Sequence, residues 1–164
     1  MSHAGDEAFL VGAAETALPG QEVLAAGIFS WQELSKAMVV GTVGGSMGAE
    51  ALTGSGMAGA VGAGVGAHMA TEAMAKANGM TVGLLVAVTA AQIHVFNWED
   101  AAAAEHVRLF DRATTAVQVT KFGLSRHVQL QDSASGQELL LHASVSPISV
   151  TSKPDKVVLH LLAE

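Results

Sequence analysis

Histidine is the residue type in this sequence best suited to chemistry, because neutral imidazole binds metals and its charge changes near neutral pH. Seven histidines are spread along the 164 residues: His3, His68, His94, His106, His127, His142 and His160. None forms an HxH, HxxH or HExxH pattern, so the sequence contains no local metal site. Separate strands could still bring His94, His127 and His142 together, but the spacing favours surface or rim positions for them.

Other residues that could do chemistry form no active-site pattern. Asp100, Glu105 and Asp111 are too scattered for an acid/base pair, because nothing in the sequence fixes their separation. The glycines at 62 and 64 lack the strand–GxGxxG–helix context of a dinucleotide site, and no GxSxG motif is present. Cysteine is absent, which excludes disulfides and Cys-ligated metal centres. We therefore expect no enzyme activity, no catalytic residue, no cofactor and no bound metal.

Composition and charge narrow the partner classes. The formal net charge is −7, with eight Lys and Arg against fifteen Asp and Glu, which argues against nucleic acid as a partner. No run of Lys and Arg marks a patch for anionic lipid. Half of the residues are hydrophobic and the mean hydropathy is +0.40, unlike a disordered chain. The first residues are acidic and lack the pattern of a secretory signal, so a cytoplasmic location is expected.

The elements that must position these residues fall into three zones. Residues 1–17 form either a short helix or a weakly ordered segment, and Gly12 interrupts the apolar pattern there. The dipeptide at 19–20, Pro-Gly, predicts a turn before an apolar strand at 23–29. Residues 31–79 are rich in Gly and Ala, and residues 80–164 have the texture of a β-domain.

The third zone predicts short strands separated by turns at 89–92 and 132–136. The expected strands are 82–88, 93–96, 106–110, 116–122, 127–131, 138–143 and 145–150. Apolar and polar residues alternate at Val117 and Val119, and again at Val128 and Leu130, as in half-buried antiparallel strands. A C-terminal helix is expected to follow, capped by Ser152 with Pro154 near its start. Its apolar face would contain Val157, Val158, Leu161 and Leu162.

The second zone predicts a helical hairpin. Ser30 and Glu33 form a capping box, so a helix is expected to begin at Trp31. The TGSG sequence at 53–56 breaks the pattern, and a second helix would end at a C-cap formed by Asn78 and Gly79.

Small residues spaced four apart predict smooth grooves on this hairpin, as in a glycine zipper. The candidate interaction residues are Gly41, Gly45, Gly48, Ala58, Gly62, Gly66 and Ala70. Packing against another helix, within the chain or in an oligomer, would offset the low helix propensity of glycine. A hairpin at or in a membrane and a disordered linker remain alternatives. His68, the single titratable group between Glu50 and Glu72, would be neutral in a tight core and make a hydrogen bond.

Several pieces of the sequence resemble bacterial pleckstrin-homology-like (PH-like) domains. Residues 18–29, LPGQEVLAAGIF, resemble the opening strand, and residues 83–98, GLLVAVTAAQIHVFNW, resemble the hairpin that follows. Residues 121–143 and 153–164, which ends KVVLHLLAE, resemble the later strands and the closing helix. The chain is also similar to small uncharacterised actinobacterial proteins in which Gly-rich sequence separates these pieces.

The resemblance implies an α+β fold, a PH-like antiparallel β-sandwich or barrel formed by residues 18–29 and 80–164. A C-terminal helix would close it, and residues 31–79 would be an inserted Gly/Ala-rich helical hairpin. The sequence departs from the family at Gln21 and Glu22 and at the 90–92 turn, Ala-Ala-Gln. The basic residues Lys121, Arg126, Lys153 and Lys156 are scattered among acids, so we expect no phosphoinositide site.

The leading functional hypothesis is a non-enzymatic interaction module. Its glycine-zipper hairpin would mediate self-association or contact with a membrane, while any protein partner stays unidentified. The main alternative is a carrier of lipid or another hydrophobic ligand, with the hairpin as its lid. A small metal-dependent enzyme that uses the dispersed histidines is a third hypothesis.

Overall fold

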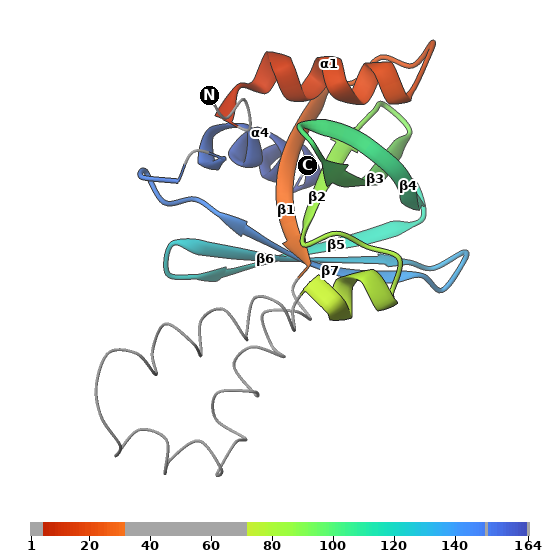
Figure 1. Ribbon diagram of the computed structural model, residues 1–164. Coiled ribbons are helices and arrows are strands. Elements are labelled where there is room, and N and C mark those ends of the chain that lie inside the picture. The colour runs from red at the N-terminus through yellow and green to blue at the C-terminus, as the bar shows by residue number, and fades with distance from the viewer. Residues whose placement is uncertain (1–4, 32–71, 150, 164) are drawn as a thin grey trace.

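The computed structural model describes residues 5–31, 72–149 and 151–163 (Figure 1). The elements are α1 (Glu7–Ala17), β1 (Ala25–Trp31), β2 (Gly83–Val88), β3 (Gln92–Glu99), β4 (Ala102–Asp111), β5 (Thr115–Phe122), β6 (Ser125–Asp132), β7 (Glu138–Ser144) and α4 (Ser152–Leu162). The strands form one seven-stranded sheet in the order β4-β3-β2-β1-β7-β6-β5, and all neighbours are antiparallel. The fold is therefore an α+β arrangement in which a β-sheet is closed by a C-terminal helix.

Strand β1 joins two meanders, β2 to β4 and β5 to β7. It pairs with β2 from Ala25 to Ser30, but with β7 only at Ser30 and Trp31. Figure 1 shows that β5, β6 and β7 run across the direction of β1, so the two halves of the sheet diverge from this short junction. Where β7 leaves β1, helix α4 takes its place, and an Oδ1 atom of Asp155 accepts the Ile28 N–H at 2.9 Å.

The main core lies between the two halves of the sheet and α4. Its largest fully buried side chains include those of Phe29, Phe110, Leu84, Leu130 and Leu141. These side chains come from strands of both halves, and Val158 of α4 is buried in the same cluster. Removing this much apolar surface from water is the main force that holds the two halves together.

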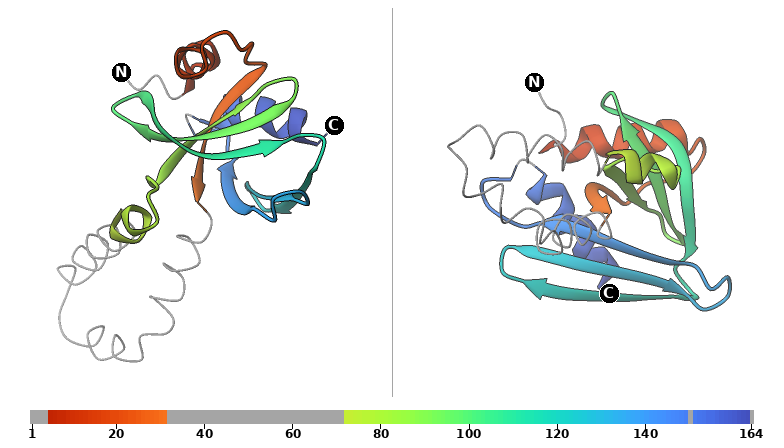
Figure 2. Two further views of the ribbon diagram at one scale, coloured as in Figure 1. Left: turned by 90° about the vertical axis from the view of Figure 1, so that its right-hand side faces the viewer. Right: turned by 60° about the horizontal axis from the view of Figure 1, so that its bottom comes forward.

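A second apolar cluster attaches α1 to the other face of β1, β2 and β3. Leu10 and Ala14 of α1 are fully buried there against Ala26, Leu85 and Phe96. The helix begins after Asp6, whose carboxylate accepts the backbone N–H groups of two residues in the first turn. The two views in Figure 2 show α1 and α4 as separate layers on the sheet. Of the two alternatives for the N-terminal segment, the structure therefore has the helix, over Glu7–Ala17.

The prediction of a β-domain with a C-terminal helix is confirmed. The strands expected at 82–88, 93–96, 106–110, 116–122, 127–131 and 138–143 are all present, although most are longer than expected. Val117 and Val119 alternate with exposed neighbours, and Val128 and Leu130 are buried. The expected turn at 132–136 is also present, with Gly136 at a φ of 72°.

Three local predictions are wrong. Trp31 does not begin a helix, because it is the last residue of β1, pairs with Leu141 and is buried in the main core. Residues 145–149 form no strand, because Pro147 lies in a turn in which Ser149 N–H bonds the carbonyl of Ser146. Ser152 is the first residue of α4 and not its cap, and Thr151 at the N-cap makes no side-chain capping bond.

Of the predicted Gly/Ala-rich hairpin, only the C-terminal end lies within the described residues. Residues 72–77 are helical and end in the expected cap, with Gly79 at a φ of 68° and Met80 N–H bonding the Ala75 carbonyl at 2.9 Å. Ala75 and Met80 are buried in the main core, so this end of the segment is anchored to the β-domain. His68 and the candidate interaction residues between Gly41 and Ala70 lie outside the described residues.

Candidate functional site

The buried histidine of the sheet pairs with a neighbour from the adjacent strand. His94 is 2% exposed, and its Nδ1 lies 3.3 Å from Nε2 of His106 on β4. Burial lowers the pKa of both imidazoles, which favours the neutral forms. The expectation of a surface position is therefore wrong for His94, because Ile93 and Val95 face the main core and His94 points to the other face, beside Phe96.

The other strand histidines form a separate pair. His127 on β6 and His142 on β7 are direct cross-strand partners, with ring centroids 5.5 Å apart. His94 belongs to the β3–β4 pair of strands. The three histidines that the sequence could have brought together are therefore divided between the two halves of the sheet. Among the described residues, no group of three His, Asp or Glu side chains could hold a metal ion.

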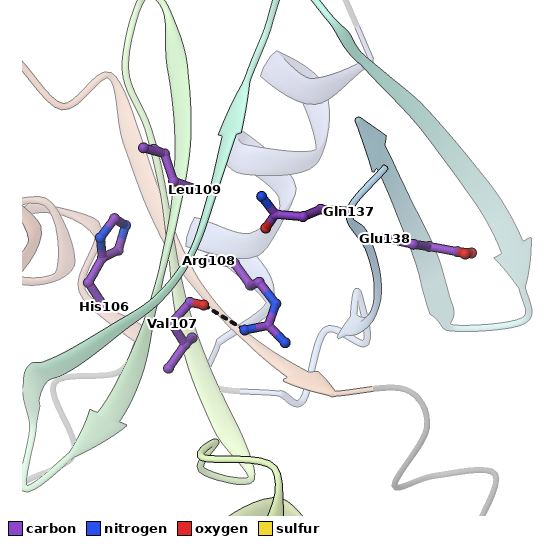
Figure 3. A pocket seen from close by; sticks show the side chains of 6 residues that line it. All are labelled: His106, Val107, Arg108, Leu109, Gln137 and Glu138. Carbon is purple, nitrogen blue, oxygen red and sulfur yellow. Dashed lines mark hydrogen bonds between the residues drawn. The ribbon is translucent and has the colours of Figure 1, made fainter. Parts of the chain in front are cut away.

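A pocket between β4 and the start of β7 is the first candidate for a ligand site. It has a volume of about 510 Å³ and is lined by His106, Val107, Arg108, Leu109, Gln137 and Glu138 (Figure 3). Arg108 donates to the carbonyl of its neighbour Val107, and Glu138 accepts a hydrogen bond from Gln129. The charged groups are thus engaged with structural partners, and Figure 3 shows Glu138 pointing away from Arg108. This arrangement provides no paired acid and base.

A second, larger groove of about 790 Å³ separates α1 from β4. Small side chains dominate its walls, including Ala13 and Ala17 of α1 and Ala103 of β4, while Phe96 and His106 also contribute. Its lining contains a single titratable side chain, that of His106. The groove has apolar walls but no convergent set of polar groups that would fix the orientation of a ligand.

The strongest candidate for a functional surface is an apolar end of the β5–β6–β7 half, defined by Phe122, Leu124 and Ile148. These side chains are 73%, 61% and 91% exposed, respectively, more than the other exposed large hydrophobic side chains found in the described part of the chain. Phe122 ends β5, Leu124 lies in the turn to β6, and Ile148 belongs to the segment after β7. Several large apolar side chains exposed together commonly mark an interaction site.

Backbone hydrogen bonds hold the two parts of the apolar end together. The β5–β6 connection is a two-residue turn, in which Gly123 has a φ of 56°, as type II′ turns require. The carbonyl of Leu124 accepts the N–H of Val145 at 2.9 Å, so the segment that carries Ile148 leaves β7 directly beside this turn. Figures 1 and 2 both show the turn and residues 145–149 at the same end of the molecule.

Two basic side chains flank the turn of the apolar end. Lys121 and Arg126 are direct cross-strand partners on either side of the turn, and Lys153 is exposed in the first turn of α4. The stretches 116–131 and 139–154 contain no Asp or Glu. Strand pairing thus brings Lys121 and Arg126 together without an acid between them, which the expectation of bases scattered among acids did not foresee.

The apolar end was missed in the sequence although it left a local signal. Hairpin turns favour polar residues and glycine, whereas here KFGLSR places Phe122 and Leu124 around Gly123 with a base on each side. Two apolar residues at a turn between amphipathic strands cannot reach the core, which predicts their exposure. The contribution of Ile148 had no such signal, because the sequence pattern suggested a strand at 145–150.

None of the helices in the described ranges is both long and apolar enough to cross a bilayer.

Comparison with protein-family models, with curated proteins and with solved structures gives no match for this chain.

Proposed function

We propose that this chain is a non-enzymatic interaction module that uses a PH-like β-domain to dock on a partner surface. The single observation that carries the proposal is the apolar end, where Phe122, Leu124 and Ile148 are exposed on a turn and an adjoining segment. Exposed apolar side chains lower the solubility of a protein. Three of them at one end of a domain whose core is well filled are best explained by a role in binding.

The order of the elements supports the PH-like assignment. An opening strand, a hairpin, later strands and a closing helix are the pieces that the sequence resemblance implies, and β1, β2–β3, β5–β7 and α4 occur in that order. The Gly/Ala-rich segment is inserted after β1, between Trp31 and Gly83.

The Gly/Ala-rich segment supplies the second part of the proposal, which is self-association. Its support is the spacing of Gly62, Gly66 and Ala70 and of Gly41 and Gly45 in the sequence. An assembly that displays several copies of the apolar end would bind a surface by avidity even if each contact were weak.

The packing between the two halves of the sheet disfavours a carrier whose hydrophobic ligand would lie there. Aromatic and aliphatic side chains fill the space between the two halves of the sheet, with Phe29, Phe110 and Leu130 fully buried. A carrier would need an apolar cavity in this region large enough for its ligand.

Native mass spectrometry and sedimentation velocity over a range of protein concentrations would test the proposed function. The full chain is expected to form a discrete oligomer, which Gly62→Leu should dissociate because leucine fills the predicted groove. Leu109→Ser, on β4 and outside both sets of proposed interaction residues, is the control and should leave the oligomer unchanged. A wild-type chain that stays monomeric at every concentration would contradict self-association.

A further inference from the structure

We propose that the apolar end docks on the surface of an anionic lipid bilayer. Phe122, Leu124 and Ile148 would enter the interfacial region, while Lys121, Arg126 and Lys153 would face the lipid phosphates. This inference rests on the proposed function, because it names the partner surface of that interaction module. It assigns membrane contact to the β-domain and not to the Gly/Ala-rich hairpin.

The size and shape of the apolar end suit a lipid surface better than a protein partner. A stable protein interface buries about 800 Å² on each partner. Even a fully buried aromatic side chain contributes only about 150–250 Å², and the apolar end has one aromatic and two aliphatic side chains at the tips of two neighbouring loops. Such a protruding set can enter the interface between headgroups and acyl chains without a complementary pocket.

The local charge identifies the lipid class. The chain has a net charge of −7, yet the strands and loops of the apolar end carry bases and no acid between residues 116 and 131. Asp155, the first acid after Glu138, is fully buried against β1 and so presents no carboxylate at the surface. A positive surface on a negative protein is complementary to anionic phospholipid and not to a neutral bilayer.

Hydrogen bonds hold one positive charge against the turn that carries Phe122 and Leu124. Nη1 of Arg126 donates to the carbonyls of Gly123 and Ser125, at 3.0 and 2.8 Å, so the guanidinium is held against the turn. Lys121 lies opposite Arg126 on the neighbouring strand. The ring of Phe122 stacks near that of His127, with centroids 6.0 Å apart, which orients it at the end of the hairpin. Because side chains alternate along a strand, Lys121 and Arg126 lie on the hairpin face opposite Phe122 and flank the apolar tip. Bases in this position can reach lipid phosphates when the tip enters the interfacial region.

Vesicle flotation with the full-length chain tests this inference. Vesicles of phosphatidylcholine alone would be compared with vesicles of phosphatidylcholine mixed with phosphatidylglycerol, at about 0.1 M salt. The wild-type chain should bind the mixed vesicles and not the neutral ones. Phe122→Ala should lower the partition coefficient about tenfold, through the loss of buried apolar surface. The loss of one base alone should lower the partition coefficient about fivefold. Lys121→Glu should lower it further, because the variant also adds a negative charge.

Matched controls separate docking from folding and from general charge. Leu109→Ala removes an exposed apolar side chain from β4, and Lys76→Glu reverses a charge on an exposed residue at 72–77. Both should bind the mixed vesicles as the wild type does, and all variants should show the same thermal unfolding midpoint. Equal effects of the controls and the apolar-end variants would overturn the inference.

Three other outcomes would also overturn the inference. Each can be distinguished from a failure of the proposed function. Absence of wild-type binding to mixed vesicles, with the oligomer intact, would remove the lipid partner but not self-association. Loss of the oligomer on Phe122→Ala would make a second copy of the chain the occupant of the apolar end. Loss of vesicle binding on Gly62→Leu, with Phe122→Ala without effect, would assign the membrane contact to the hairpin.

Discussion

Gly27 is the residue that allows α4 to lie directly against the central strand. A Cβ atom at this position would be 2.9 Å from Oδ1 of Asp155 and 3.2 Å from its Cα. The close approach lets the Asp155 carboxylate reach the Ile28 N–H, which β7 cannot satisfy because it pairs with β1 only at Ser30 and Trp31. A glycine in a strand often marks such an approach of another backbone.

Gly27→Ala should therefore destabilise the protein by about 1–3 kcal/mol, because the added methyl group would push the α4 backbone away from β1. Gly12→Ala is the matched control: it lies in α1, where an added Cβ would meet nothing within 4 Å. That change should instead stabilise the protein by up to about 1 kcal/mol, through higher helix propensity. Urea unfolding of both variants would check the opposite signs, and equal effects would contradict the role of Gly27.

The carboxyl group of Asp155 makes stability depend on pH. Burial raises its pKa from 3.8 to about 7, against the smaller opposite effects of the nearby Thr151 hydroxyl and the Ile28 amide. A folded-state pKa above the unfolded one means that protonation stabilises the fold. This contribution is fully present below about pH 4 and is lost as the pH rises through about 7.

Asp155→Asn should remove this pH dependence, since the amide retains an oxygen acceptor for Ile28 but does not ionise. The difference in unfolding free energy between wild type and variant should change by more than about 1 kcal/mol from pH 4 to pH 8, in favour of the variant at high pH. Using this difference cancels the opposite trend from His94 and His106, whose lowered pKa values weaken the fold as the pH falls below about 6.5. If the unfolding free energies of the wild type and the variant changed in parallel with pH, ionisation of Asp155 in this range would be contradicted.

At the scale of elements, the strands were predictable wherever both local pattern and burial agreed. Val117 and Val119 in β5 and Val128 and Leu130 in β6 alternate with polar residues, and these strands form as expected. Trp31 shows the limit: its local capping box favours a helix, but long-range pairing with Leu141 and burial of the indole favour a strand. Local sequence cannot report a partner more than a hundred residues away.

The candidate site was less predictable than the strands, because it depends on which loops become neighbours. The Leu124 carbonyl meets the Val145 N–H only after β6 has paired with β7. Likewise, the pairing of His94 with His106 depends on the register between β3 and β4, which contains irregularities around Phe96. The sequence indicated the residue types of the candidate site. Which charged and apolar side chains become neighbours depends on the order of the strands in the sheet.

The β3–β4 hairpin makes a prediction at the same scale. Its two turn residues, Asp100 and Ala101, have φ values of 49° and 59°, as a type I′ turn requires. Alanine is strained in this conformation, whereas glycine is not. Ala101→Gly should therefore raise the unfolding free energy by about 0.5–1 kcal/mol, after allowance for the greater freedom of glycine in the unfolded chain.

Ala104→Gly is the control for this hairpin, because residue 104 lies within β4 and is also exposed. Glycine inside a strand should lower stability by about 0.5–1 kcal/mol. Thermal unfolding of the two variants would separate turn strain from a general effect of glycine. A lower midpoint for both variants would show that Ala101 is not strained in solution.

At the scale of the whole molecule, the proposed docking surface opposes the net charge. The chain carries −7 overall, whereas residues 116–131, which include the turn of the apolar end, contain Lys121 and Arg126 and no acid. An anionic membrane would therefore repel the protein as a whole and attract this end at close range. The range of each force depends on salt, since screening acts over about 30 Å at 0.01 M and about 10 Å at 0.1 M.

Binding to anionic vesicles should consequently pass through a maximum as salt increases. At about 0.01 M the repulsion of distant acids reaches the membrane, at about 0.1 M the nearby bases dominate, and at about 1 M screening acts within about 3 Å and weakens both. Flotation with phosphatidylglycerol-containing vesicles at these three concentrations would measure the effect. Lys121→Glu should reduce the maximum, because it removes a nearby attraction and adds to the repulsion. A steady decrease in vesicle binding from the lowest salt concentration would contradict this prediction. It would mean that attraction by the nearby bases exceeds repulsion by the net charge even at long range. The acids of α1 and β4 would then lie too far from the bound membrane to repel it.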